Sequence, residues 1–159
     1  AGGMDNSKIS LGPKGIAPLS GHCMCGAVSF EIDEPLIGGA YCWCTRCQRR
    51  TGTAFSTSGL TVPGSTRFTG DEDHIRVFEP GDGGWNKCSC KLCGGQTHTI
   101  NPENPDVVLI RFGALDQDPV TRLMAHQFVD YAPAWYPVPD DGLPRFPERL
   151  DWSLVDFDS

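Results

Sequence analysis

Eight cysteines fall into three short clusters, and their spacing constrains the fold of this chain more than any other feature. The clusters are Cys23 with Cys25, then Cys42, Cys44 and Cys47, and then Cys88, Cys90 and Cys93. Thiolates one or two residues apart can close on one ion, because tetrahedral Zn²⁺ takes sulfur ligands at roughly 2.3 Å. Cysteines this close along the chain rarely form a disulfide with each other. The spacing therefore predicts bound metal rather than disulfides.

Counting ligands predicts one closed site. Cys23 and Cys25 supply two ligands and cannot fill a zinc site alone. Cys90 and Cys93 form a second pair, and the glycine that follows, Gly94, frees backbone amides to turn toward sulfur. The two pairs together supply the four thiolates of a closed, structural zinc site.

The middle cluster predicts a site of a different kind. Cys42, Cys44 and Cys47 offer three thiolates within six residues and have no obvious fourth partner. A zinc ion with an open coordination position is a catalytic one, because a water or a substrate heteroatom can occupy that position. We therefore expect two zinc ions per chain, one structural and one catalytic.

Cys88 has no assigned role in this scheme. One interpretation is a free thiol that is partly buried and inert, as free cysteines commonly are. The other is that Cys88 replaces a member of the Cys90 and Cys93 pair or completes the open site. An iron–sulfur cluster is a weaker interpretation, because no spacing here matches the usual ferredoxin runs.

Composition and charge limit the classes of partner. The chain has 159 residues and a net charge of −7, which disfavours nucleic acid as a partner. No apolar run approaches the ~18 residues of a membrane helix, and the first residues lack a secretory signal. We expect a cytoplasmic protein whose thiols meet a reducing environment. Arg46, Arg49 and Arg50 crowd the middle cysteines, either as a solvated basic turn or as a patch that attracts an anionic small molecule.

The pattern along the chain predicts one mainly β domain. Period-two alternation or apolar runs predict strands from Ala27 and over residues 55–62, 74–78, 107–112 and, with a weaker signal, 123–129. A short helical turn is expected over residues 45–50. We expect residues 1–3 to be a cloning remnant ahead of a native Met4, 4–20 to be an arm, 21–150 to be the zinc domain, and 151–159 to be a tail.

These motifs resemble those of the glutathione-dependent formaldehyde-activating enzymes, the family that also contains centromere protein V. The resemblance covers about residues 21–147 in the family's order. Its specific part is the three cysteine clusters, with Gly26, Thr51, Gly52 and Gly94 beside them. Weaker matches follow at residues 113–116, 125–129, 134–135 and 141–146.

The resemblance implies a zinc-stabilised, β-tent-like domain of short antiparallel strands. By this resemblance Cys23, Cys25, Cys90 and Cys93 hold the structural zinc, while Cys42, Cys44 and Cys47 hold the second, more labile ion. It also implies carbon–sulfur lyase activity that joins formaldehyde to glutathione. The chain departs from the family at Trp43, where a histidine is usual. An indole donates one hydrogen bond but cannot carry a proton near neutral pH.

Three functional hypotheses follow. The first is a zinc lyase or addition enzyme acting on a small thiol adduct or a carbonyl compound, with His126, Trp43 and Arg46 as catalytic residues and His126 as the acid/base. The second keeps the fold but uses an aromatic or polyketide-like metabolite for elimination, ring opening or dehydration, with Trp43 and Phe55 lining the pocket. The third is a zinc-stabilised interaction module without chemistry.

Overall fold

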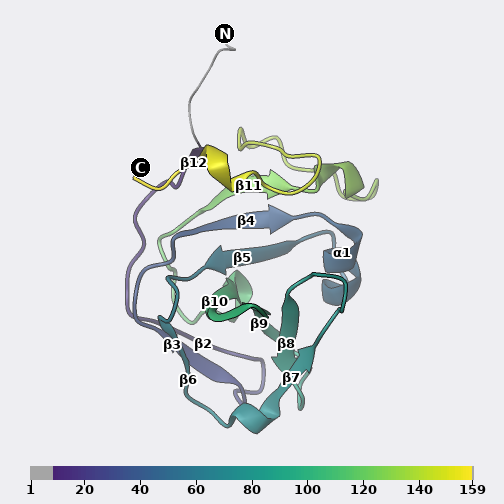
Figure 1. Ribbon diagram of the computed structural model, residues 1–159. Coiled ribbons are helices and arrows are strands. Elements are labelled where there is room, and N and C mark those ends of the chain that lie inside the picture. The colour runs from purple at the N-terminus through teal and green to yellow at the C-terminus, as the bar shows by residue number, and fades with distance from the viewer. Residues whose placement is uncertain (1–8, 159) are drawn as a thin grey trace.

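The computed structural model describes residues 9–158, so the expected remnant at residues 1–3 and the start at Met4 lie outside the described part. Seven strands form the main sheet, in the order β11-β4-β5-β10-β9-β8-β7 (Figure 1). The β11–β4 pair is parallel, and the other pairs of this sheet are antiparallel. The strands are β4 (Gly38–Cys42), β5 (Ser56–Leu60), β7 (Ile75–Phe78), β8 (Asn86–Cys90), β9 (Gln96–Asn101), β10 (Asn104–Arg111) and β11 (Leu123–Gln127).

Two smaller sheets complete the β structure. The first contains β2 (Leu19–His22), β3 (Ser29–Ile32) and β6 (Thr66–Phe68), and the second pairs β1 (Ile9–Ser10) with β12 (Val155–Asp156). Within the described residues, α1 (Thr45–Thr51) is the one α-helix, and it follows β4 directly. Short 3₁₀ turns lie at Glu72–His74, Phe112–Ala114, Val129–Tyr131 and Trp152–Leu154. The mainly β, antiparallel fold class expected from the sequence is confirmed.

Alternation along the strands places the core between the main sheet and the three-stranded sheet. Phe30 and Ile32 of β3 are buried against Val108 and Ile110 of β10. Because neighbouring residues of a strand point to opposite faces, Leu109 and Arg111 face the other side of the main sheet. That second face carries a cavity, described below.

The segment expected to be an N-terminal arm contributes to the structure at two points. Ile9 pairs with Val155 and packs against a second apolar cluster beside β4 and β11. Leu19, at the start of β2, is 1% exposed and belongs to the main core. The tail from residue 151 likewise contains β12, whose Val155 is buried. Within the described residues, β1 and β12 therefore pair with each other and join the two ends of the described chain.

Candidate functional site

Cys23, Cys25, Cys90 and Cys93 form a four-thiol cluster. Their sulfur atoms all lie within 4.8 Å of one another. The Cys23 and Cys25 sulfurs are 3.7 Å apart, and those of Cys25 and Cys90 are 3.8 Å apart. Four sulfurs at roughly 2.3 Å from a tetrahedral ion would be separated by roughly 3.8 Å. The donor set and its spacing therefore fit one tetrahedral metal ion.

Backbone amides of two turns hold these sulfurs in place. The N–H groups of Val28, Leu92 and Gly95 donate to the sulfurs of Cys23, Cys90 and Cys93 at 3.3, 3.3 and 3.4 Å. The turn after β8 requires a left-handed residue, which Gly94 supplies at φ +76°. Hydrogen bonds from the backbone of Cys25 and Gly95 lower the pKa of the Cys93 thiol to about 6. These contacts favour the thiolate form that a metal ion requires.

Cys42, Cys44 and Cys47 form a three-thiol cluster where β4 passes into α1. Their sulfurs also lie within 4.8 Å of one another, and no fourth cysteine, histidine or carboxylate of residues 9–158 joins them. Cys44 is the N-cap of α1, and its sulfur accepts the Cys47 N–H at 3.2 Å. The turn from strand to helix thus brings three thiols of one short segment to one point.

The Cys47 sulfur is the most stabilised anion of this cluster. Hydrogen bonds from Cys42 and Cys44 lower the pKa of Cys47, and those two contacts are the largest causes. Ser56 Oγ and Arg50 Nη2 also donate to this sulfur, each at 3.2 Å. The same thiol–thiol contacts, with burial, raise the pKa of Cys42. These contacts therefore favour the thiolate form of Cys47 and the protonated form of Cys42.

A cavity of about 150 Å³ opens beside the three-thiol cluster on the second face of the main sheet. Cys42 and Cys47 line one side of it, together with Arg50 of α1. Lys87 of β8 and Arg111 of β10 line it from strands farther along the sheet. A reactant in this cavity would contact sulfur and cationic groups together.

The structure does not bring His126 to the thiols. Its side chain is fully buried, Nδ1 accepts from Trp43 Nε1 at 3.0 Å, and Nε2 lies 2.9 Å from Asp141 Oδ2. His126 also stacks on Tyr41, whose side chain faces away from that of its strand neighbour Cys42. Both ring nitrogens are engaged on the far side of the sheet, so these contacts do not support the expected acid/base role.

The side chains of Trp43 and Arg46 are also engaged by other residues of the protein, namely His126 and Asp82. Trp43 is 0% exposed and is not among the residues that line the cavity beside the three thiols. Arg46 forms an exposed ion pair with Asp82, with 2.7 Å between Nη1 and Oδ2. Of the three arginines noted in the sequence, Arg50 is the one that contacts a cysteine sulfur.

Cys88 belongs to neither cluster. It is 2% exposed, and burial raises the pKa of its thiol to about 11. These observations agree with the interpretation of an inert, buried thiol.

Sequence reasoning missed three residues that the structure brings to the three-thiol cluster, namely Ser56, Lys87 and Arg111. Arg111 carried a usable signal, since it is a charge that continues the apolar run of residues 107–110 into the same strand. Lys87 carried none, because β8 has no apolar periodicity. Their convergence depends on the order of strands in the sheet, which spacing along the chain does not reveal.

Comparisons with known proteins agree with these observations. The sequence profile of the family described as glutathione-dependent formaldehyde-activating enzyme matches residues 18–131. A Halomonas elongata protein, provisionally named as such an enzyme, is 24% identical over 127 residues, which are 74% of this chain and 78% of that protein. A crystal structure of a Rhodobacter sphaeroides protein superposes with a TM-score of 0.53 at 20% identity, over 80% of this chain and 98% of the other. That likeness supports the fold. On the extent of the profile match, the chain belongs to the glutathione-dependent formaldehyde-activating enzyme family.

Proposed function

We propose that the protein is a zinc-dependent carbon–sulfur lyase that adds a small thiol to a carbonyl compound, or reverses that addition. The observation that carries this proposal is the three-thiol cluster, which lacks a fourth protein ligand within residues 9–158 and borders a cavity. Family membership supports the same class, because the family is named for chemistry on glutathione and formaldehyde.

Cys42, Cys44 and Cys47 would hold the catalytic zinc, and Cys23, Cys25, Cys90 and Cys93 the structural one. The catalytic ion supplies a Lewis-acidic position at which a thiolate sulfur or a carbonyl oxygen can be held and polarised. In the addition, a carbon–sulfur bond forms, the carbonyl π bond breaks, and the thiol proton ends on the new hydroxyl group. The reverse reaction returns the same proton to sulfur.

The residues around the cluster have definable tasks in this scheme. Arg50 and Ser56 hydrogen-bond to the Cys47 sulfur, and so they fix its position and reduce the electron density that it donates. Trp43, His126 and Asp141 form a chain of hydrogen bonds behind β4, which runs from the buried Trp43 and His126 to the exposed Asp141. We propose that this chain positions the segment of Cys42 and Cys44, a role that acts through the thiols and involves no contact with the substrate.

The interaction-module hypothesis and the aromatic-substrate hypothesis have less support. Trp43 was the main reason to expect an aromatic substrate, and its indole is buried. Phe55 does border a neighbouring cavity of about 360 Å³, where it could contact part of a substrate. None of the helices in residues 9–158 is long and apolar enough to cross a membrane.

Replacing Cys44 by serine tests the proposal. We expect the variant to fold, to bind one zinc ion instead of two, and to lose at least about 100-fold in the rate of thiol addition to formaldehyde above the spontaneous reaction. Metal content, circular dichroism and the rate with glutathione are measured together. Cys88→Ser is the matched control, because it removes a thiol outside both clusters.

Each failure has its own meaning. A Cys44→Ser protein with unchanged turnover would contradict the assignment of the catalytic site. A wild-type protein that holds two zinc ions but shows no rate with formaldehyde and glutathione would favour another substrate or a binding role.

A further inference from the structure

Three cations of distant sequence origin meet beside the three-thiol cluster. Arg50 comes from α1, Lys87 from β8 and Arg111 from the end of β10, and all three line the cavity of about 150 Å³. Arg50 and Lys87 also line an adjoining cavity of about 300 Å³, and Arg50 and Arg111 one of about 360 Å³. The residues that line these three cavities include no aspartate or glutamate.

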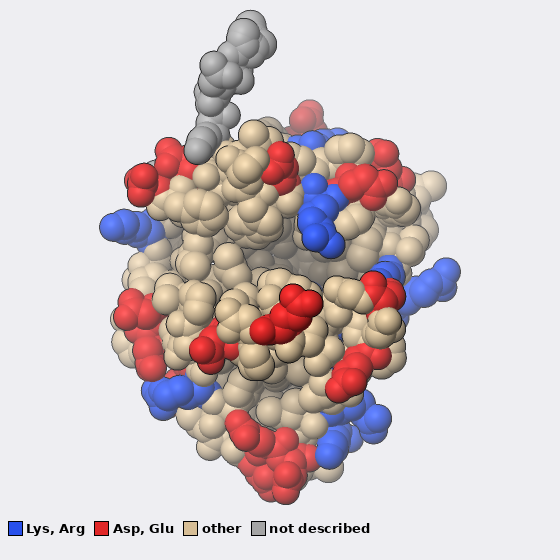
Figure 2. Space-filling model, viewed as in Figure 1, with Lys and Arg blue, Asp and Glu red and all other residues tan. Residues whose placement is uncertain are grey.

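This absence of acids is notable because the chain is acidic, with a net charge of −7. Acidic side chains are spread over the whole face shown in Figure 2, including its centre. Clustered cations in an acidic protein require nearby negative charge to offset their mutual repulsion. The thiolates of Cys42, Cys44 and Cys47 supply only part of it, because a divalent ion would cancel most of their charge. Three thiolates and one divalent ion sum to −1, and the three cations bring the region to +2.

The cations are also short of hydrogen-bond partners. The Arg111 guanidinium makes one side-chain hydrogen bond within the described residues, from Nη1 to Ser58 Oγ at 2.8 Å. The Lys87 ammonium makes none among them. The Nε atoms of Arg50 and Arg111 are buried and find no partner in residues 9–158. Buried cationic donors that lack acceptors are costly, so the arrangement is stable only if something compensates for it.

The titration behaviour of these groups agrees with mutual repulsion. Burial, and after it the positive charges of Arg50 and Arg111, lower the pKa of Lys87 to about 8. Burial is also the main reason that the pKa of Arg111 is lowered. A bound anion would relieve both effects.

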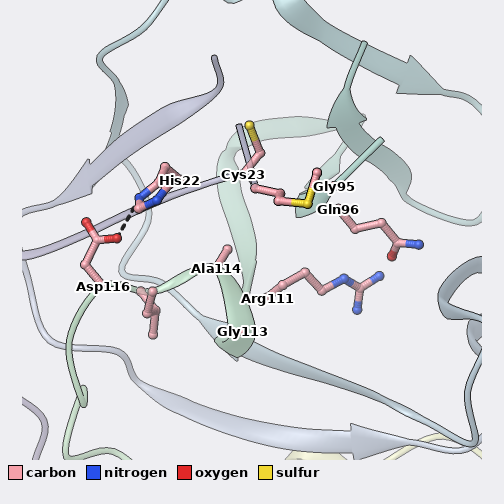
Figure 3. A pocket seen from close by; sticks show the side chains of 10 residues that line it. His22, Cys23, Gly95, Gln96, Arg111, Gly113, Ala114 and Asp116 are labelled. Carbon is pink, nitrogen blue, oxygen red and sulfur yellow. Dashed lines mark ion pairs between the residues drawn. The ribbon is translucent and has the colours of Figure 1, made fainter. Parts of the chain in front are cut away.

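The direction of Arg111 indicates which side an anion would approach. Figure 3 shows Arg111 and Gln96 pointing the same way, away from the ion pair of His22 and Asp116. That pair already has its own contact, at 2.7 Å between Nδ1 and Oδ1. The guanidinium of Arg111 therefore points away from Asp116, and it lines one cavity with Arg50 and Lys87.

We propose that Arg50, Lys87 and Arg111 form a carboxylate-binding subsite for the substrate of the three-thiol centre. Arg50 shows how close this subsite lies to the three-thiol cluster. Its guanidinium contacts the Cys47 sulfur at 3.2 Å, and it lines the cavity together with Lys87 and Arg111. A carboxylate bound there lies only a few bonds from a sulfur or carbonyl group at the metal centre. The preferred substrate is thus an anionic thiol or its aldehyde adduct. Only the position of the thiol rests on the proposed function.

A matched pair of small thiols tests this subsite on the zinc-loaded protein. The pair is 3-mercaptopropionate and 3-mercaptopropan-1-ol, which have the same chain length and differ in the carboxylate. By titration calorimetry we expect wild type to bind the acid at least about tenfold more tightly than the alcohol, as expected for a charge-assisted contact. Lys87→Met should reduce this preference to about twofold or less, and Arg111→Met should do the same if it folds.

Arg49→Met is the control, because it removes the same charge from an exposed position on α1. It should keep the full preference for the acid. Equal affinities of wild type for the two thiols, or a preference that Lys87→Met leaves intact, would overturn the subsite.

Propionate, which has no thiol, separates this inference from the proposed function. One outcome is that 3-mercaptopropan-1-ol does not bind, propionate binds as tightly as 3-mercaptopropionate, and Lys87→Met weakens the binding of propionate. The carboxylate subsite then stands and the proposed thiol chemistry fails. If propionate and 3-mercaptopropionate both fail to bind, the subsite fails. Zinc-loaded protein that binds the alcohol alone would leave the thiol chemistry supported without the subsite.

Discussion

Lys87 shows how the fold changes the chemistry of a single side chain. Its pKa falls from an ordinary 10.5 to about 8, mainly through burial and then through Arg50 and Arg111. Arg46 also repels it, whereas the Cys47 thiolate attracts it. Among these neighbours the arginines stay protonated at working pH, so Lys87 itself sets the pH at which the basic region loses charge.

We therefore predict that the preference for 3-mercaptopropionate over 3-mercaptopropan-1-ol depends on pH. Because the folded pKa of Lys87 is depressed, its charge is present below about pH 8 and is lost as pH rises through that value. The ratio of the two dissociation constants should be largest near pH 7 and decline several-fold by pH 9.5. Ionisation of the thiol cancels in this ratio. In Lys87→Arg the ratio should stay level, since arginine remains charged, and an equal decline there would contradict the prediction.

At the scale of elements, α1 converts a short stretch of sequence into a metal-binding geometry. The helix is capped at its start by Cys44 and ends at Gly52, whose φ is +73° and whose N–H donates to Gln48 O at 2.8 Å. A left-handed residue with a Cβ is strained even where space is open, as it is beside Gly52. The conformation at the end of α1 thus depends on Gly52, and the positions of Cys47 and Arg50 depend on α1.

Gly52→Ala should lower the free energy of unfolding by about 1 kcal/mol, because alanine resists the left-handed conformation. We also expect weaker metal binding at the three-thiol cluster and unchanged binding at the four-thiol cluster, measured by urea denaturation and by competition with a chelator. Gly64→Ala is the control. Gly64 has a φ of +82° and open space around it, but it lies in the turn after β5. Equal metal loss in both variants would count against a local role of α1.

The elements that the sequence predicted are those with a strong local signal. The apolar run at residues 107–112 and the alternation around Phe30 became β10 and β3, and the expected helical turn became α1. In contrast, β4 begins Gly-Gly-Ala, and β8 and β9 are rich in polar residues. Neighbouring strands stabilise these elements, so their own residues show little periodicity. The cysteine groups were predictable because ligand spacing is local, whereas the Lys87 and Arg111 contacts depend on strand order.

At the scale of the whole molecule, the two thiol clusters relate to the fold in different ways. The three-thiol cluster lies within one segment of six residues. The four-thiol cluster joins the turn between β2 and β3 to the turn between β8 and β9, and Cys25 and Cys90 are 65 residues apart. It therefore connects the three-stranded sheet to the main sheet. An ion held there closes a long loop and would stabilise both sheets together.

Cys25→Ser should therefore mainly lower stability, whereas Cys44→Ser should leave stability nearly unchanged and mainly lower activity. Loss of the four-thiol ion in Cys25→Ser should lower the free energy of unfolding by about 4 kcal/mol, because loss of a metal is one of the few single changes with effects of that size. Cys44→Ser should change the free energy of unfolding by less than about 1 kcal/mol, because the serine Oγ can still accept at the N-cap of α1 and no sheet is disconnected. In wild type, mild chelation should remove one ion while the folded spectrum persists and the second only as the protein unfolds. The measurements are zinc content and circular dichroism along one chelator titration. If the two ions leave together, or if Cys25→Ser unfolds at the same urea concentration as wild type, the four-thiol cluster does not hold the sheets together.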